Sequence, residues 1–296
     1  MKKISIIILS LAITATVFAQ ETSKHEFSIN AGGGISTLLY SSNVGVQSNG
    51  FGYTFGLGYT FNFSENWAIL TGVDLAFYNS SYEAKTLSHS YSIAHSTITP
   101  LPLPGSDTRF DVTYEYTNYE ENQAATYLNI PIMAQFSTSG ENKFYVAAGA
   151  KIGIPISSKY KIEGGRLDLT GYSHYTGQPY PGNDYPIPTD PKENYDDGHG
   201  FGRSTPTDEA DLNFKLSCML SLEMGAKWKL AERWNLYTGI YFDYGLNNIS
   251  DTNEKRMVEY KESGNHIYNS AIQSMPANID GINNMAIGLK IKVSFR

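Results

Sequence analysis

The segment LNFKLSCMLSLEMGAKWKL, residues 212–230, decides the class of fold. Its even positions are apolar, as at Leu216 and Leu220, whereas its odd positions include Lys215 and Glu223. A helix would spread these apolar side chains around its whole circumference, but a strand places all of them on one face. The segment is therefore predicted to be a β-strand with one apolar and one polar face.

Seven further segments alternate in the same way: 27–39, 51–63, 67–77, 128–136, 144–156, 234–246 and 283–295. Short turns join some of them, at 64–66, 137–142 and 231–233, and long connections join the others, at 40–50, 78–124, 157–211 and 247–282. An even number of antiparallel strands with short turns at one rim predicts an all-β, eight-stranded transmembrane up-and-down β-barrel with long extracellular loops. Residues 110–116 also alternate, so a ten-stranded barrel stays open as an alternative.

Aromatic side chains gather on the apolar face near the short turns. They are Phe61, Phe63, Trp67, Phe136, Phe144, Trp228, Trp234 and Phe295. Such a cluster at one rim is typical of an interfacial girdle at the lipid head groups, and a soluble barrel core gives no reason for it. The apolar face is therefore expected to meet outer-membrane lipid.

The polar face carries charged residues that we expect to form a lumen charge network. They are Asp74, Lys151, Lys215, Glu223, Lys227, Asp243 and Lys290. An eight-stranded barrel is just wide enough for side chains to fill it, so these groups are expected to pair and plug the lumen. No water-filled channel is predicted.

The N-terminus and the overall composition bear on the compartment. Residues 1–19, MKKISIIILSLAITATVFA, have a basic start, a short apolar run and a small final residue, which predicts a cleaved signal peptide. Residues 20–296 are then the barrel domain, exported to the outer membrane. The formal charge of −7 argues against nucleic acid as a partner. The one cysteine, Cys218, excludes an intramolecular disulfide and is expected to act as a small hydrophobe on the lipid face.

Two consecutive segments resemble a known family. YLNIPIMAQF at 127–136 and FYVAAGAKIGIPIS at 144–157 are similar to the fourth and fifth strands of the PorT-like small outer-membrane β-barrel proteins of Bacteroidota. The resemblance implies an outer-membrane location. It also implies that the barrel-assembly machinery is a partner and reads the aromatic Phe295 near the C-terminus.

Two groups of residues are candidates for a catalytic or metal site. His89 and His95 lie in a serine-rich segment, but no orienting acid or oxyanion device is readable beside them. Asp196, Asp197 and His199 lie within one turn, but they lack the spacing of a calcium loop. We therefore predict no catalytic residue, no metal and no cofactor.

The long connections carry the functional hypothesis. Residues 172–195 are dense in Tyr, Pro, Gly and Asp, a composition that suits an exposed contact surface and equally a merely solvated loop. We expect a non-enzymatic barrel that presents surface loops for binding, adhesion or envelope assembly, with an extracellular ligand or protein as partner. The alternatives are a small transport pore and a barrel-borne lipid hydrolase.

Overall fold

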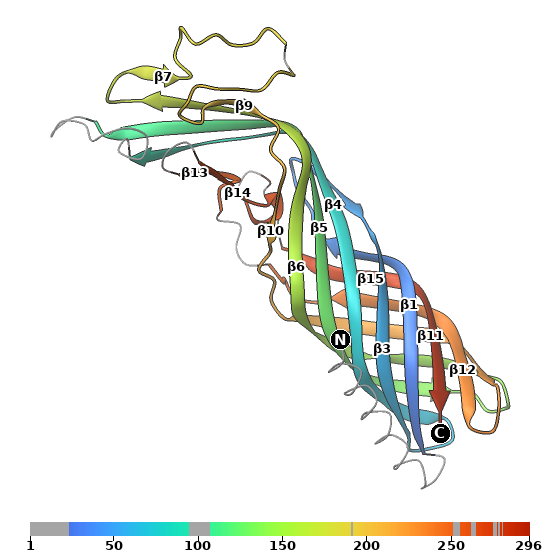
Figure 1. The fold of residues 1–296 in the computed structure, drawn as a ribbon. Helices are drawn as coiled ribbons and strands as arrows, with labels where there is room; N and C mark the ends of the chain where they lie inside the picture. Colours follow the sequence, from blue (N-terminus) through green and yellow to red (C-terminus); the bar gives the residue numbers. More distant parts are fainter. Residues whose placement is uncertain are drawn as a thin grey trace, which may run out of the picture.

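The computed structural model describes residues 24–94, 107–190, 192–250, 255–261, 265–274, 277, 279 and 281–296. Eight long strands dominate it (Figure 1): β1 (His25–Leu39), β3 (Phe51–Asn62), β4 (Trp67–Ala94), β5 (Arg109–Ser137), β6 (Lys143–Ser173), β11 (Ser217–Lys229), β12 (Trp234–Gly245) and β15 (Asn283–Phe295). The shorter elements are β2 (Val46–Asn49), β7 (Gln178–Tyr180), β8 (Tyr195–Asp196), β9 (Gly202–Ser204), β10 (Asp208–Asp211), β13 (Val258–Tyr260), β14 (His266–Tyr268) and the 3₁₀ turn η4 (Ala271–Gln273). No helix within these ranges is long and apolar enough to cross a membrane. The predicted signal peptide, 1–19, lies outside the described residues.

The eight long strands form a closed antiparallel ring. β1 pairs with β15, from Phe27 opposite Phe295 onward, and β6 pairs with β11, so every long strand has a neighbour on both sides. The predicted eight-stranded up-and-down barrel is confirmed. The ten-stranded alternative is wrong, because the additional strands lie outside the ring.

The two faces of the ring differ sharply. Large apolar side chains point outward, with Leu289 70% and Phe144 73% exposed. Polar side chains point inward, where Asn30, Asp74 and Lys151 are buried. This is the arrangement of a barrel surrounded by lipid, whereas a soluble barrel buries its apolar side chains.

Three strands continue well beyond the ring. β4, β5 and β6 have 28, 29 and 31 residues, whereas β3 and β12 have 12 each. β4 pairs with β3 only as far as Ala76, and β6 pairs with β11 only as far as Gly153. We call the parts beyond the ring, residues 78–94, 109–126 and 157–173, the extension. Much of the predicted loops 78–124 and 157–211 is therefore strand.

The extension bends away from the barrel where two strands are irregular (Figure 1). The pairing of β5 with β6 shifts register between Thr117 and Glu120, and Asn118 between them has φ 54°. Opposite, Gly165 of β6 has φ 121°, a conformation that glycine adopts without a steric penalty. A bulge of this kind bends a strand and increases its twist.

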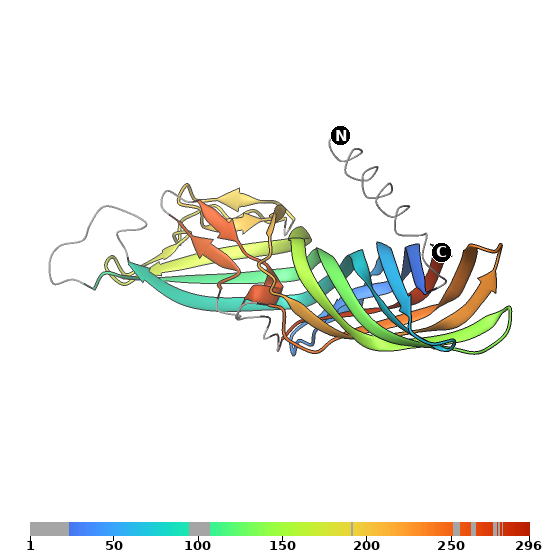
Figure 2. The ribbon, with the colours of Figure 1, turned by 90° about the horizontal axis from the view of Figure 1, so that it is seen from below.

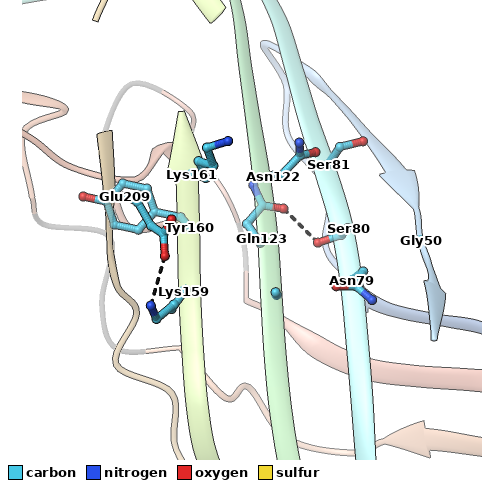
Figure 3. A pocket seen from close by; sticks show the side chains of 11 residues that line it. Gly50, Asn79, Ser80, Ser81, Asn122, Gln123, Lys159, Tyr160, Lys161 and Glu209 are labelled. Carbon is cyan, nitrogen blue, oxygen red and sulfur yellow. Dashed lines mark hydrogen bonds and ion pairs between the residues drawn. The ribbon is translucent and has the colours of Figure 1, made fainter. Parts of the chain in front are cut away.

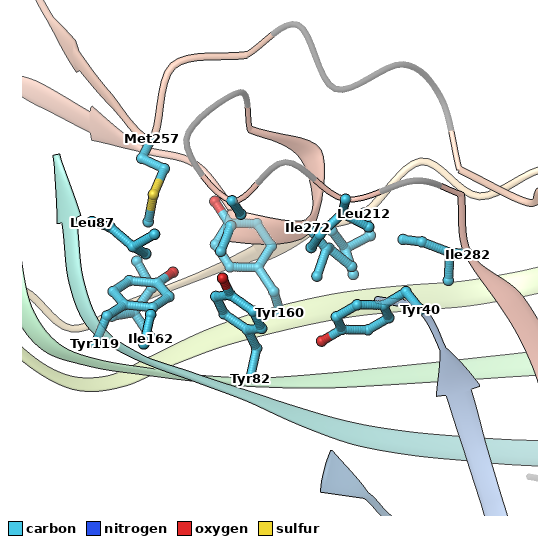
Figure 4. Packing of buried hydrophobic residues seen from close by; sticks show 14 of the residues in the cluster. Tyr40, Tyr82, Leu87, Tyr119, Tyr160, Ile162, Leu212, Met257, Ile272 and Ile282 are labelled. Atoms are coloured by element: carbon cyan, nitrogen blue, oxygen red, sulfur yellow. The ribbon is translucent and has the colours of Figure 1, made fainter. Parts of the chain in front are cut away.

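A hydrophobic core lies on the inner face of the extension, at the long-loop rim (Figure 4). The strands contribute mainly tyrosines, such as Tyr82 and Tyr119, and the downstream connections contribute Met257, Ile272 and Ile282. We call the extension, together with the described parts of 195–214 and 249–282 that pack on it, the cap. The described parts of the long connections thus pack on the extension and share one hydrophobic core with it.

The strand predicted over 212–230 begins only at Ser217. Leu212 and Phe214 are buried in the core of the cap instead of facing lipid. Lys215 precedes β11, where its backbone N–H donates to the carbonyl of Ile249, and its side chain is exposed. The prediction that Lys215 belongs to the lumen charges was wrong, because the alternation before Ser217 arises from packing in the cap.

The outward face generates a direct test. Leu289 lies in the middle of β15, opposite Gly33 and Ile240. Leu289→Arg is expected to block assembly, because a charge at the bilayer midplane costs about 2–4 kcal/mol. The measurement is gel mobility of the outer-membrane fraction with and without boiling. The control is Leu230→Arg beside a short turn, where the cost falls to about 0–1 kcal/mol. Normal assembly of the Leu289 variant would show that this face does not meet lipid.

Candidate functional site

Glu26 forms the centre of one polar cluster in the lumen, near the short-turn rim. Its carboxylate accepts hydrogen bonds from the hydroxyls of Tyr237, at 2.6 Å, and Ser294. The Nζ of Lys227 lies 3.0 Å and the Nε of Arg296 3.2 Å from the same carboxylate. Two cations and two hydroxyls therefore compensate a carboxylate that is 1% exposed.

A second cluster fills the lumen farther from this rim. The Nζ of Lys290 lies 2.6 Å from the Oε1 of Glu223 and 4.0 Å from the Oδ2 of Asp74. The Nζ of Lys151 lies 2.8 Å from the Oδ2 of Asp243. All five side chains are less than a tenth exposed. Buried ion pairs of this kind are tolerated where each charge finds its partner at close range.

Six of the seven residues predicted for the lumen lie in these two clusters, and Lys215 does not. Glu26 and Lys292 also belong to the lumen but are absent from the predicted network. The Nζ of Lys292 lies 4.2 Å from the centre of the Tyr237 ring. Both have a readable signal, since Glu26 is in phase with Ser28 on the polar face and Lys292 is in phase with Lys290.

Side chains fill the lumen beside the second cluster. The cavity bordered by Asn30, Asp74, Glu223 and Lys290 has a volume of about 30 Å³. That is room for one or two water molecules, since one needs about 10–15 Å³. The Oδ1 of Asn30 is buried there without a partner among the described residues, and a water molecule would satisfy it.

The residues predicted for the aromatic girdle lie around the short-turn rim. Phe61 and Phe295 are half-buried, and the other six are exposed. Trp67 packs edge-on against Phe136 across the β4–β5 pair, with 5.2 Å between ring centres. Trp234 lies 5.7 Å from Phe295 across the β12–β15 pair.

Glu121 joins the extension to the last loop of the cap. This residue of β5 is 1% exposed and accepts four hydrogen bonds: from the Tyr119 hydroxyl at 2.5 Å, the Gln123 amide at 2.8 Å, the Ser270 hydroxyl at 2.5 Å and the backbone N–H of Ala271 at 2.8 Å. Burial raises the pKa of the Glu121 carboxyl, and these hydrogen bonds oppose the shift. The carboxyl thereby anchors the start of η4 on β5.

A groove of about 380 Å³ lies where the barrel passes into the extension (Figure 3). We call it the outer groove. Among the residues that line it are Asn79 and Ser81 of β4, Asn122 and Ala124 of β5, Lys159 and Lys161 of β6, and Glu209 of β10. The Nζ of Lys159 lies 2.9 Å from the Oε1 of Glu209, and both side chains are half-exposed. Phe51 comes directly after the lining residue Gly50, and Ile156 comes three residues before Lys159. Both are exposed and apolar, so the groove adjoins the apolar belt of the barrel.

A second cavity, of about 310 Å³, lies within the cap between β6, β9 and β14. Leu167, Leu169, Arg203 and Tyr268 line it, together with His266. The Nε2 of His266 is buried without a partner among the described residues. Burial lowers the pKa of this imidazole, while the charge of nearby Asp196 opposes the shift.

The remaining candidate residues have structural roles. His89 lies on the extension with its ring 6.1 Å from that of Tyr114, and His95 lies outside the described residues. Asp196 and Asp197 accept hydrogen bonds from the backbone of their own turn, at Gly198 and His199. In the part of the chain that the structure describes, no three His, Cys, Asp or Glu side chains come together to hold a metal.

Cys218 and the tyrosine-rich loop 172–195 are the remaining features singled out in the sequence. Cys218 is exposed on the outward face of β11, between Leu216 and Leu220. In the loop 172–195, Tyr172 is exposed, whereas Tyr180 packs on the rings of Phe110 and Phe201 at 5.4 and 5.8 Å. Only part of that loop is therefore available for contact.

A closed eight-stranded ring with an apolar outside and an ion-paired lumen defines an outer-membrane β-barrel protein. The chain belongs to the family described as outer membrane protein beta-barrel domain, which matches residues 18–251. The protein is located in the outer membrane. No curated protein matches the sequence.

Solved barrels are similar to this chain at low sequence identity. Neisserial surface protein A is 8% identical over 92% of this chain and 97% of its own, with a TM-score of 0.33. A major outer membrane protein of Thermus thermophilus is 13% identical over 92% and 99%, with a TM-score of 0.33. The attachment invasion locus protein Ail of Yersinia pestis, solved with the heparin analogue sucrose octasulfate, is 12% identical over 92% and 99%, with a TM-score of 0.28.

The buried pair Lys151–Asp243 predicts a non-additive loss of stability. Lys151→Met removes the ammonium nearest to Asp243 and is expected to cost about 3–5 kcal/mol of unfolding free energy. Lys151→Met with Asp243→Asn is expected to cost less, because no charge is left uncompensated. Urea titration followed by gel mobility measures both. A double variant as unstable as the single one would contradict the pairing.

The hydrogen bonds of Glu121 predict a defect confined to the cap. Glu121→Gln replaces one acceptor oxygen by an amide, so at least one buried donor loses its partner at a cost of about 1–3 kcal/mol. Limited proteolysis of the intact barrel should then cleave the 249–282 region faster, while the boiling-dependent mobility shift stays unchanged. Glu83→Gln on the exposed face of the same sheet is the control. Equal cleavage of the two variants would show that Glu121 does not anchor the cap.

Proposed function

We propose that this protein is a non-enzymatic surface-binding protein whose cap meets an extracellular ligand or partner. The observation that carries the proposal is the continuity of β4, β5 and β6 from the ring into the cap. Three unbroken strands hold the cap and the outer groove in a fixed position above the barrel. Binding sites on rigid elements are more defined than sites on free loops.

The lumen supports this proposal over the transport pore. The two ion-paired clusters and the cavity of about 30 Å³ leave little room for a solute. The lipid hydrolase gains no support either, since His89 packs on a tyrosine ring and, among the residues described, has no carboxylate bonded to it.

The orientation in the envelope follows from the two rims. We infer that the aromatic girdle lies at the periplasmic head groups and that the cap faces outside. In the same proposal, residues 1–19 are removed on export, the barrel-assembly machinery reads Phe295, and the chain is a relative of the PorT-like barrels of Bacteroidota.

The chemistry of the outer groove favours one class of ligand. It combines the ammonium groups of Lys159 and Lys161, which are ion-paired with Glu209 and Glu163 at the surface, with amide and hydroxyl groups. All of these groups can bond to hydroxyl-rich chains. An oligosaccharide at the cell surface offers such hydroxyls along its length. We therefore propose an oligosaccharide as the ligand of the outer groove.

The test measures binding of the purified barrel to immobilised oligosaccharides. Asn122→Ala with Lys161→Ala is expected to weaken binding about tenfold or more, because two hydrogen-bonding groups are lost, one of them charged. Thr170→Ala, exposed on β6 away from the groove, is the control and should bind normally. Unchanged binding of the double variant, or no binding by the native protein, would refute the oligosaccharide site. Ion conductance of the native barrel in a planar bilayer would refute the plugged lumen and favour the pore.

A further inference from the structure

One margin of the extension is an unpaired β-strand edge. β2 pairs with β4 only as far as Glu83, opposite Val46. Beyond it, β4 pairs on one side alone, with β5, from Thr86 opposite Thr117 to Ala94 opposite Arg109. We call Thr86–Ala94 the open edge. It forms the margin of the extension in Figure 2, and no described strand lies beyond it.

The opposite margin of the same sheet is covered. β10 pairs with β6 at residues 159–162, β9 at 167–169 and β7 at 171–173. The chain therefore uses three of its own segments to pair with one edge, whereas none of the strands in the described ranges pairs with the other edge beyond Glu83. The sheet already binds extended backbone at its margin, which is the chemistry of strand addition.

The open edge lacks the usual protection. Natural edge strands are blunted by proline, by charged side chains or by bulges. The segment Thr86–Ala94, TLSHSYSIA, contains no proline and no Lys, Arg, Asp or Glu. Lys85, which has no pairing partner in β5, precedes it rather than interrupting it. Within the described part of the chain, no strand pairs with the outward N–H and C=O groups of this segment.

We propose that a second copy of this chain adds to the open edge, antiparallel, so that the two extensions form one continuous sheet. Full overlap of Thr86–Ala94 with its copy places Leu87 opposite Ile93 and Ser88 opposite Ser92, with Ser90 opposite itself. On the inner face, where Leu87 and Tyr91 are buried, Leu87 then meets Ile93 and His89 meets Tyr91. On the exposed face serine meets serine at 88, 90 and 92, and Thr86 meets Ala94. The absence of formal charge in the segment means that self-pairing brings no like charges together.

The placement of the barrel agrees with a two-fold pair in one membrane. Figures 1 and 2 show the barrel continuing from one end of the extension, and Figure 1 shows the barrel bent downward from it. Antiparallel pairing of two edges in one sheet requires a two-fold axis normal to the sheet. Rotation about that axis keeps both barrels on the same side, as insertion into a single bilayer demands.

Thiol cross-linking of the full chain in mild detergent tests the pairing. In a Cys218→Ser background, Ser90→Cys places one thiol opposite itself across the proposed interface, where facing Cβ atoms lie about 4.5–5.5 Å apart. A short bis-thiol cross-linker is expected to convert this variant to dimer. Thr170→Cys is the matched control, since it is exposed on the same face of the sheet but belongs to β6. Equal or absent dimer formation by the two variants would overturn the proposal.

A charge exchange at the same position separates self-pairing from general adhesion. Ser90→Lys and Ser90→Glu should each dimerise about fivefold more weakly than the native chain, because like charges then face each other. A mixture of the two should form the mixed dimer preferentially. Light scattering of the two variants alone and together measures this. Monomeric native protein, or cross-linking of Ser90→Cys only to a different protein in whole cells, would show that the edge does not take a second copy. These outcomes leave the oligosaccharide site untouched, because the outer groove lies apart from the open edge.

Discussion

Backbone hydrogen bonding without water is the constraint on which this structure depends. Inside a bilayer each unpaired N–H or C=O costs several kcal/mol, so a sheet can cross only as a closed ring. The pairings of β1 with β15 and of β6 with β11 close the ring. Where neighbouring strands of the ring approach each other closely, only a small residue fits. At Gly34 an added Cβ would lie 2.2 Å from the carbonyl oxygen of Ile287 in β15. The ring therefore determines both the pattern and some of the residue types.

The narrow ring leaves little space in the lumen for a ligand or a solute. Eight strands enclose little more than their own inward side chains, and here these are ion-paired and hydrogen-bonded to one another. The polar interior consequently stabilises the barrel and leaves little space to bind or conduct. The surface that we propose for recognition lies instead where β4, β5 and β6 continue beyond the ring. The outer groove and the open edge both belong to that region.

The alternation in the sequence sufficed to predict the ring, but not the cap. Strands that face lipid alternate between strongly apolar and polar residues, so Leu289 and Lys290 are easily assigned to opposite faces. In the extension the inner face is built from tyrosines, which count as polar or apolar, and the irregularity at Asn118 shifts their phase between Tyr116 and Tyr119. Glu121 gave no local signal, because Ser270 and Ala271, which bond to it, lie far away in the sequence. Lys215 was misplaced because Leu212 and Phe214 continue the alternation for a different reason, their burial in the cap.

The position of Ile282 has a consequence for the order of folding. Ile282 is buried in the core of the cap, and β15, the strand that closes the ring, begins at the next residue, Asn283. The core of the cap and the strand that closes the ring are thus adjacent in the chain. Packing of Ile282 in the cap and pairing of β15 in the ring therefore depend on each other. We therefore expect a barrel whose last strand has not paired to pack the interior of its cap less completely. In the proposed orientation, protection of that interior from added protease is therefore a readout of finished assembly.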